Sequence, residues 1–202
     1  MHPKEFKQTR AGTGRFAHIA LADSELHVGV EFENFSPVQS LLHDPTYSPM
    51  LLYPGPESRN LSQGGLTSGD LGGKRLLVFL LDATWACAKK MLKLSPSLQV
   101  LPRIGFIPEA KSRWIIKQQP DEMCLSTLEA THELLIALEK SGLDHYERPQ
   151  QLLEVFQKMQ DFQLQCASDP AKDGYRRKPY RPPSERVVTR QDRSGRNLFF
   201  QG

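Results

Sequence analysis

The chain has 202 residues, 39% of them hydrophobic, which is enough for one domain with a sizeable core and a tail. Its 26 Lys and Arg against 23 Asp and Glu give a net charge of +3, and no apolar run approaches the ~20 residues of a transmembrane helix. The polar, basic start is unlike a secretory signal, and three widely spaced cysteines are unlike a disulfide framework or a zinc site. We therefore expect a cytoplasmic location and no metal site.

The first part of the chain combines a basic loop with short apolar stretches. Residues 2–15 contain the sequences HPKE and TGR. Gly12 and Gly14 in this segment permit tight turns of the backbone. Residues 16–21 predict a short helix or strand, and residues 26–30 predict a strand.

A second predicted strand covers residues 50–53. The Pro-Gly-Pro sequence at 54–56 ends it, which leaves backbone groups at the edge of the sheet. The flexible Gly-rich loop at 62–74 has neither the spacing nor the Ser or Thr of a phosphate-binding loop. We therefore predict no nucleoside triphosphate site in this loop.

The apolar run at residues 76–81 is the clearest pattern in the chain. Its length and unbroken hydrophobicity predict a central strand that is covered on both faces. Residues 83–93 predict an amphipathic helix, with Asp82 at its N-cap. In a parallel sheet this corner lies at the carboxyl ends of the strands, where ligands usually bind. Asp82, Thr84 and Trp85 are therefore candidate site residues, although capping alone would explain Asp82.

The second half of the chain predicts two more strands and a long helix. Residues 98–101 predict a strand that places Arg103 in the loop after it, and residues 112–117 predict another strand. Ser126 and Glu129 form the S-x-x-E pattern of a capping box, which predicts the start of the helix. That pattern explains both residues without any function.

The last predicted helix, at residues 150–166, precedes a basic tail. Residues 168–202 carry nine Lys or Arg and four Asp or Glu, so this segment has a charge of +5 and the rest has −2. Such a Pro- and Arg-rich segment cannot bury a core, and it indicates either a solvated linker or a nucleic-acid contact. Because strands and helices alternate before it, we predict an α/β fold with a largely parallel sheet flanked by helices.

Four segments of the chain occur in an order that resembles the DTW-domain family, relatives of the SPOUT RNA-modifying enzymes. They are HPKE with TGR, LLYPG, DATW with LPR, and LSTLEA. The resemblance implies a SPOUT-like fold with a trefoil knot toward its C-terminal side. It implies a catalytic domain at residues 1–167 and a basic tail at 168–202, whose closing NLFFQG is similar to a protease-cleavage remnant.

The resemblance also implies a reaction. The 3-amino-3-carboxypropyl group of S-adenosylmethionine would pass to N3 of a tRNA uridine, leaving 5′-methylthioadenosine. The expected cofactor is S-adenosylmethionine and the expected partner is tRNA, with no membrane and with a monomer slightly favoured. Asp82 would either remove the N3 proton or orient the uracil. Two alternatives stay open: a SPOUT-type RNA methyltransferase, and a non-catalytic RNA-binding module in which DATW only caps and packs.

The site residues that the resemblance implies form three groups. The catalytic group is Asp82, Thr84 and Trp85. The cofactor-binding group is Leu52, Tyr53, Pro54, Leu101, Arg103, Leu125, Ser126 and Thr127. The RNA-binding group is Lys4, Arg15, Lys89, Lys90, Arg113, Arg176, Arg177 and Lys178. Simpler interpretations are core packing for Trp85, ion pairing within the protein for Arg103 and a solvated helix face for the lysines.

Overall fold

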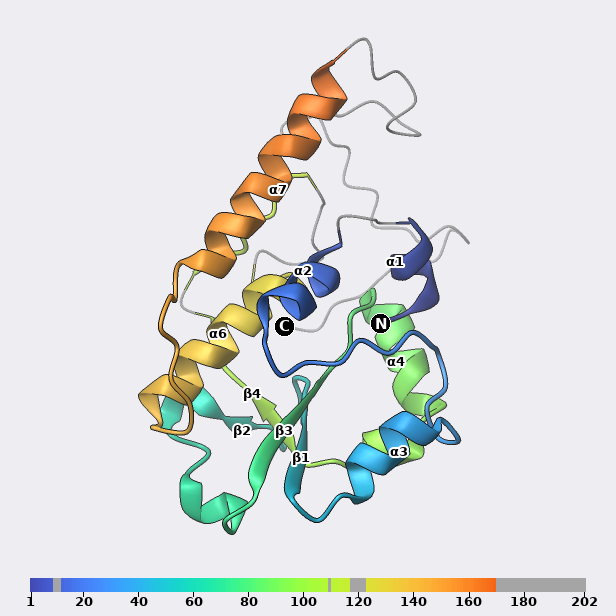
Figure 1. Cartoon of the computed structure of the whole chain (residues 1–202), viewed down its shortest axis with the longest axis vertical. Helices are drawn as coiled ribbons and strands as arrows, with labels where there is room; N and C mark the ends of the chain where they lie inside the picture. Colours follow the sequence, from blue (N-terminus) through green and yellow to red (C-terminus); the bar gives the residue numbers. More distant parts are fainter. Residues whose placement is uncertain (9–11, 109, 117–122, 170–202) are drawn as a thin grey trace.

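The structure of the chain is a computed structural model, shown in Figure 1. It describes residues 1–8, 12–108, 110–116 and 123–169. Three of the predicted RNA-binding residues, Arg176, Arg177 and Lys178, lie outside the described residues. Within the described part, no helix combines the length and the apolar character that crossing a membrane requires.

A four-stranded parallel sheet forms the centre of the fold. Its strands are β1 (Tyr47–Leu52), β2 (Arg59–Asn60), β3 (Arg75–Leu80) and β4 (Arg103–Gly105), in the order β2-β4-β1-β3. All the pairs are parallel. The predicted α/β class with a largely parallel sheet is therefore confirmed.

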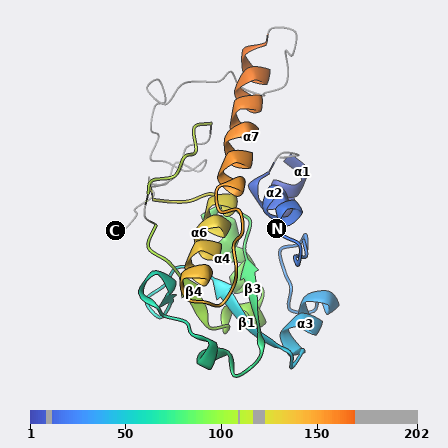
Figure 2. The same cartoon turned by 60° about the vertical axis from the view of Figure 1, so that its left-hand side comes forward.

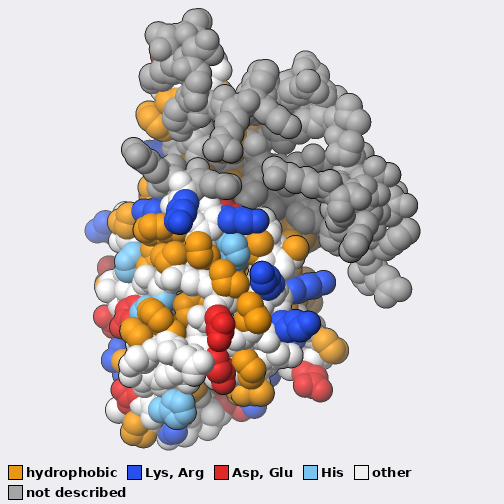
Figure 3. Space-filling view, turned by 90° about the vertical axis from the view of Figure 1, so that its right-hand side faces the viewer, with side chains coloured by type: hydrophobic (Ala, Val, Ile, Leu, Met, Phe, Trp, Pro, Cys, Tyr) orange, Lys and Arg blue, Asp and Glu red, His pale blue; other side chains and the backbone are white. Residues whose placement is uncertain are grey.

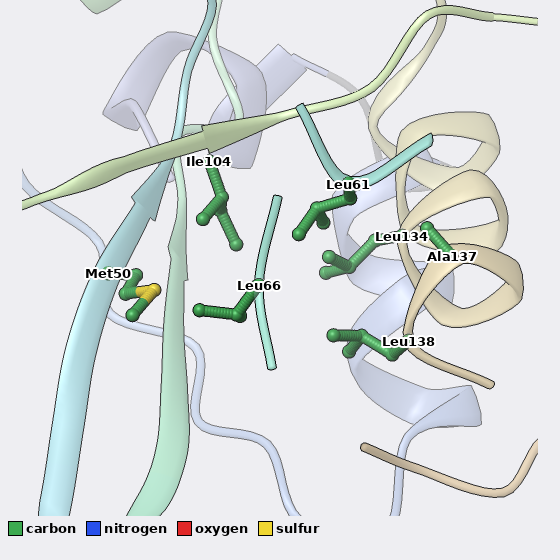
Figure 4. Close-up of a cluster of buried hydrophobic side chains, with 7 residues drawn as sticks. All are labelled: Met50, Leu61, Leu66, Ile104, Leu134, Ala137 and Leu138. Carbon is green, nitrogen blue, oxygen red and sulfur yellow. The ribbon is translucent and has the colours of Figure 1, made fainter. Parts of the chain in front are cut away.

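Helices cover both faces of this sheet. Because successive side chains of a strand point to opposite faces, neighbouring residues of one strand pack against different helices. Met50 of β1 packs in the cluster that Figure 4 shows, against α6 (Thr127–Lys140). The neighbouring Leu51 packs on the opposite face. There it meets α3 (Ser36–His43), α4 (Trp85–Lys93) and α5 (Pro96–Gln99).

The remaining helices extend the fold beyond the sheet. Helix α7 (Gln151–Ser168) packs on α6 through a third cluster of Leu128, Leu152, Phe156 and Met159, and then runs away from the sheet, as Figure 2 shows. Helix α2 (Thr13–Ala20) contacts both α6 and α7. Helix α1 (Pro3–Gln8) precedes α2 in the chain. The N-terminal segment lies beside the carboxyl ends of the strands.

The strand predicted at residues 76–81 is β3, but its predicted central position is wrong. It lies at the edge of the described sheet with β1 as its neighbour, whereas β1 has a strand on each side. Cover on both faces is confirmed, since Leu76 and Val78 pack on the α6 side and Phe79 packs on the other. An unbroken apolar run indicates two covered faces and says nothing about strand order.

Three other predicted strands are wrong. Residues 26–30 and 112–116 form no strand, and residue 117 lies outside the described residues. Residues 98 and 99 belong to α5, and residues 100 and 101 follow it directly, so none of them forms a strand. Pro96 takes a first position of that helix, where a missing N–H has no consequence, so it begins a helix.

The Gly-rich loop contains two turns of 3₁₀-helix. They are η1 (Leu61–Gln63) and η2 (Ser68–Leu71). Gly64 and Gly72 follow these turns with φ of 73° and 58°, a left-handed conformation that glycine adopts without strain. The loop is therefore more ordered than its composition predicts.

Candidate active site

The strand-to-helix corner after β3 presents Asp82 in a way that capping does not explain. Thr84, and not Asp82, is the N-cap of α4, and its hydroxyl accepts a hydrogen bond from the N–H of Cys87 at 3.4 Å. The predicted capping role of Asp82 is therefore wrong, because the helix begins two residues later than its pattern indicates. The carboxylate points instead toward α6, where the Thr127 hydroxyl donates to Asp82 Oδ1 at 2.6 Å.

Segments far apart in the chain meet at Asp82. The N–H of His2, from the HPKE sequence, donates to the backbone carbonyl of Asp82 at 2.9 Å. Gly14, from TGR, packs against the carboxylate, and Thr127, from LSTLEA, donates to it. Three of the four resembling segments thus meet around this one residue.

Gly14 is buried in the first turn of α2 and lies directly against the acid. A Cβ built at this position would lie 2.5 Å from Asp82 Cγ, and between 2.6 and 2.8 Å from the two carboxylate oxygens. No side chain fits there unless Asp82 moves. Gly14 is not among the site residues that the sequence predicted, and the TGR motif is the one signal in the sequence that points to it.

A row of aromatic and basic side chains runs from this corner along the carboxyl edge of the sheet. Trp85, at the start of α4, meets Tyr53 edge-on at 5.9 Å between ring centroids. The guanidinium of Arg103 lies 5.5 Å from the Tyr53 ring centroid. Burial raises the pKa of the Tyr53 phenol, while the charge of Arg103 opposes that shift. Trp85 is 38% exposed, so core packing does not account for the whole ring.

Arg103 begins β4 and is half-buried beside a cavity, so its predicted loop position is wrong. The cavity has a volume of about 380 Å³ and is lined by Pro56, Glu57, Gln99, Val100, Leu101, Pro102 and Arg103. Among the described residues, no carboxylate forms an ion pair with Arg103. The guanidinium is therefore available to an anionic group of a ligand.

The remaining predicted cofactor residues are divided between two places. Leu52 and Pro54 flank Tyr53 at the end of β1, while Leu125 and Ser126 precede α6. Ser126 is the N-cap of that helix, and its capping box with Glu129 is confirmed. The carboxylate of Glu129 accepts the Ser126 N–H at 2.8 Å, and the Ser126 hydroxyl accepts the Glu129 N–H at 3.2 Å.

Most of the described basic candidates are exposed. Lys4 lies on α1, and Lys89 and Lys90 lie on α4. Figure 3 shows the side of the molecule on which α1 and α4 lie, where Lys and Arg side chains alternate with hydrophobic ones. Arg15 differs, because it donates to the carbonyl of Phe6 at 2.9 Å and lies 3.9 Å from that ring, which joins α1 to α2.

The segment that carries Arg113 is held by two buried polar side chains. Glu129 accepts the N–H of Arg113 at 2.6 Å and the hydroxyl of Ser112 at 2.9 Å. Gln160 of α7 accepts the N–H of Ile115 at 2.6 Å and donates to the carbonyl of Arg113 at 3.0 Å. Side chains thus bond backbone groups of the segment that the sequence predicted to be a strand. The exposed Arg113 side chain is presented on a fixed backbone.

Comparison with known proteins gives the relatives of this chain. A family model described as the DTW domain matches residues 1–164. The chain is 35% identical over 106 residues to tRNA-uridine aminocarboxypropyltransferase 2 of Drosophila melanogaster, an alignment that covers 52% of this chain and 39% of that protein. It is 31% identical over 116 residues to the protein of the same name from Mus musculus, covering 57% and 37%.

A third relative of the same name, from Macaca fascicularis, is 28% identical over 146 residues, covering 71% of this chain and 48% of that protein. The chain therefore spans less than half the length of these curated relatives. No solved structure matches the chain significantly.

Proposed function

This chain belongs to the DTW-domain family, and from that premise we propose that it modifies tRNA. The proposed reaction transfers the 3-amino-3-carboxypropyl group of S-adenosylmethionine to N3 of a uridine. The names of the relatives support this reaction class. The main structural support is the meeting of the HPKE, TGR and LSTLEA segments at Asp82.

The reaction itself makes modest demands on the protein. A bond forms between uridine N3 and the donor carbon as the carbon–sulfur bond breaks, and the sulfur keeps the electron pair in 5′-methylthioadenosine. S-adenosylmethionine supplies a sulfonium, which is already an excellent leaving group. The protein must therefore position the two substrates and take up the N3 proton.

The proposed roles follow from the position of each side chain. Asp82 accepts the N3–H of the uracil, either as the base or as the group that orients the ring. Trp85, with 38% of its surface exposed, stacks on the uracil, a contact that typically stabilises a complex by ~1 to 3 kcal/mol. Thr84 holds the start of α4, so that Trp85 keeps its position.

The residues around the 380 Å³ cavity fit the donor's amino-acid end. Arg103 has no anionic partner among the described residues, and a carboxylate matches its planar fork of donors. Leu101 supplies an apolar contact on the same wall. We assign to Lys4, Lys89, Lys90 and Arg113 a sequence-independent attraction for RNA phosphates.

Several finer features of this proposal rest on the family resemblance. They are the SPOUT-like knot and the division into a catalytic domain at 1–167 and a tail. We also propose a cytoplasmic location, which the three widely spaced cysteines favour, and a monomeric state.

Incubation with S-adenosylmethionine labelled in its carboxypropyl arm and unmodified bulk tRNA tests the function, followed by nucleoside mass analysis. We expect labelled uridine and released 5′-methylthioadenosine. S-adenosylhomocysteine as the product would identify a methyltransferase instead, and absence of both products would favour a binding module.

The variant Asp82→Ala tests the role of the acid. It is expected to abolish transfer while the Kd for S-adenosylmethionine changes by less than a few-fold. Asp144→Ala, at an exposed acid in the loop between α6 and α7, is the matched control and is expected to retain full turnover. Full turnover of Asp82→Ala would refute the assignment.

A further inference from the structure

We propose that Thr127 is a positioning residue that fixes Asp82 by one carboxylate oxygen and leaves the other, Oδ2, to receive the uridine. This inference rests on the proposed function. It gives Thr127 a role different from the direct cofactor contact that the family resemblance implies. It also adds Gly14 to the residues on which the reaction depends.

The hydrogen bond to Asp82 uses the only hydrogen of the Thr127 hydroxyl. A hydroxyl carries one hydrogen, and that of Thr127 is directed at Asp82 Oδ1 at 2.6 Å, a distance typical of a bond to a charged acceptor. The same hydroxyl therefore cannot donate to a cofactor at the same time. Asp82 is half-buried, and its Oδ2 accepts no hydrogen bond from the part of the chain that the structure describes, so the acceptor capacity of this oxygen is not used there.

The start of α6 holds Thr127 rigidly. Thr127 is the first residue of α6, directly after the buried capping box of Ser126 and Glu129. Its carbonyl also accepts the hydroxyl of Thr131 at 2.8 Å, one turn further along the helix. A donor that is held in this way on both sides fixes the orientation of its acceptor better than one on a loop.

Gly14 packs against the carboxylate of Asp82. Its backbone lies so close that a Cβ would approach both oxygens to less than 3 Å, so this side of the carboxylate is closed. With Thr127 holding one oxygen and Gly14 closing one side, rotation of the carboxylate is restricted. A fixed acceptor loses little freedom when the uridine binds, which favours the reactive geometry.

Replacement of Thr127 by Val and by Ser tests the inference. Thr127→Val keeps the shape but removes the donor, and we expect kcat to fall on the order of 10- to 100-fold. The Kd for S-adenosylmethionine is expected to stay within about 2-fold, and Thr127→Ser is expected to restore kcat to within about 3-fold of the wild type. Ser141→Ala, which removes a hydroxyl at the far end of the same helix, is the control and should leave kcat unchanged.

Gly14→Ala tests the packing independently of the hydrogen bond. A methyl group there must displace the carboxylate, so we expect a fall in kcat similar to that of Thr127→Val. Gly69→Ala is the matched control, because a Cβ at Gly69 meets only the Thr67 hydroxyl at 3.6 Å. Unchanged kcat in both Gly14→Ala and Thr127→Val would overturn the inference, as would a loss of cofactor affinity that accounts for the whole effect of Thr127→Val.

A measurement without turnover separates this inference from the proposed function. In urea denaturation, Thr127→Val is expected to lower the midpoint in the wild-type background but to have a much smaller effect in the Asp82→Ala background. Equal effects in both backgrounds would show that the two side chains do not interact. An inactive wild type with clear coupling would instead refute the transfer reaction and retain the contact between Thr127 and Asp82.

Discussion

The variant Glu129→Gln is predicted to destabilise the fold strongly without changing the size of the side chain. Glu129 is 4% exposed, and its oxygens accept from the N–H groups of Ser126 and Arg113 and from the hydroxyl of Ser112. An amide has one acceptor oxygen, so its NH₂ group must face one of the two backbone donors. Loss of one bond to a charged acceptor, with a buried donor left unpaired, costs roughly 2 to 4 kcal/mol.

Equilibrium urea denaturation, followed by far-UV circular dichroism, measures this change in the free energy of unfolding. The exposed Glu31→Gln is the control and is expected to lie within about 0.5 kcal/mol of the wild type. A change of less than 0.5 kcal/mol for Glu129→Gln would refute the reasoning, because the three contacts would then contribute nothing. A large change in the free energy of unfolding with an unaltered affinity for tRNA would show that Glu129 stabilises the fold. It would also show that Glu129 does not affect tRNA binding through the position of Arg113.

Three further predictions concern charge, pH and packing. Lys89→Ala and Lys90→Ala are each expected to weaken tRNA binding and to reduce the slope of log K against log salt by roughly 0.7 to 0.9, whereas Lys74→Ala, at the opposite end of β3, should not. Burial lowers the pKa of His132 from its ordinary value of 6.5, so the unfolded chain takes up a proton first as the pH falls. As the pH is lowered below about 6.5, the urea concentration at the unfolding midpoint is therefore expected to decrease. The decrease is expected to be smaller in His132→Gln. Leu51→Ala, at a fully buried site in β1, should lower the free energy of unfolding by about 2 to 5 kcal/mol in the same assay.

Features of the fold that depend on neighbouring residues could be predicted from the sequence. The start of α6 follows from Ser126 and Glu129, which lie three residues apart and satisfy each other's backbone groups. The corner after β3 follows from the end of the apolar run at Asp82. These signals are local, and the structure retains them.

Features that depend on distant residues could not be predicted. Asp82 and Thr127 are 45 residues apart, and no periodicity relates a strand end to the first turn of a later helix. The edge position of β3 depends on where β4 pairs, and β4 has only three residues. The strand predicted at 112–117 is wrong over its described residues, because Glu129 and Gln160 satisfy backbone groups that a neighbouring strand would otherwise pair.

The corner around Asp82 has a consequence for the order in which the protein loses its properties. It is assembled from the N-terminal segment at His2 and Gly14 and from the start of α6, so it exists only while both rest on the end of β3. The hydrophobic clusters on the two faces of the sheet do not contain these residues. Mild denaturant can therefore detach the N-terminal segment while the sheet persists, because the parts of a fold open locally at different free energies. Turnover would then disappear at a lower denaturant concentration than the far-UV circular dichroism signal. Catalysis would therefore report complete folding of the chain more sensitively than circular dichroism does.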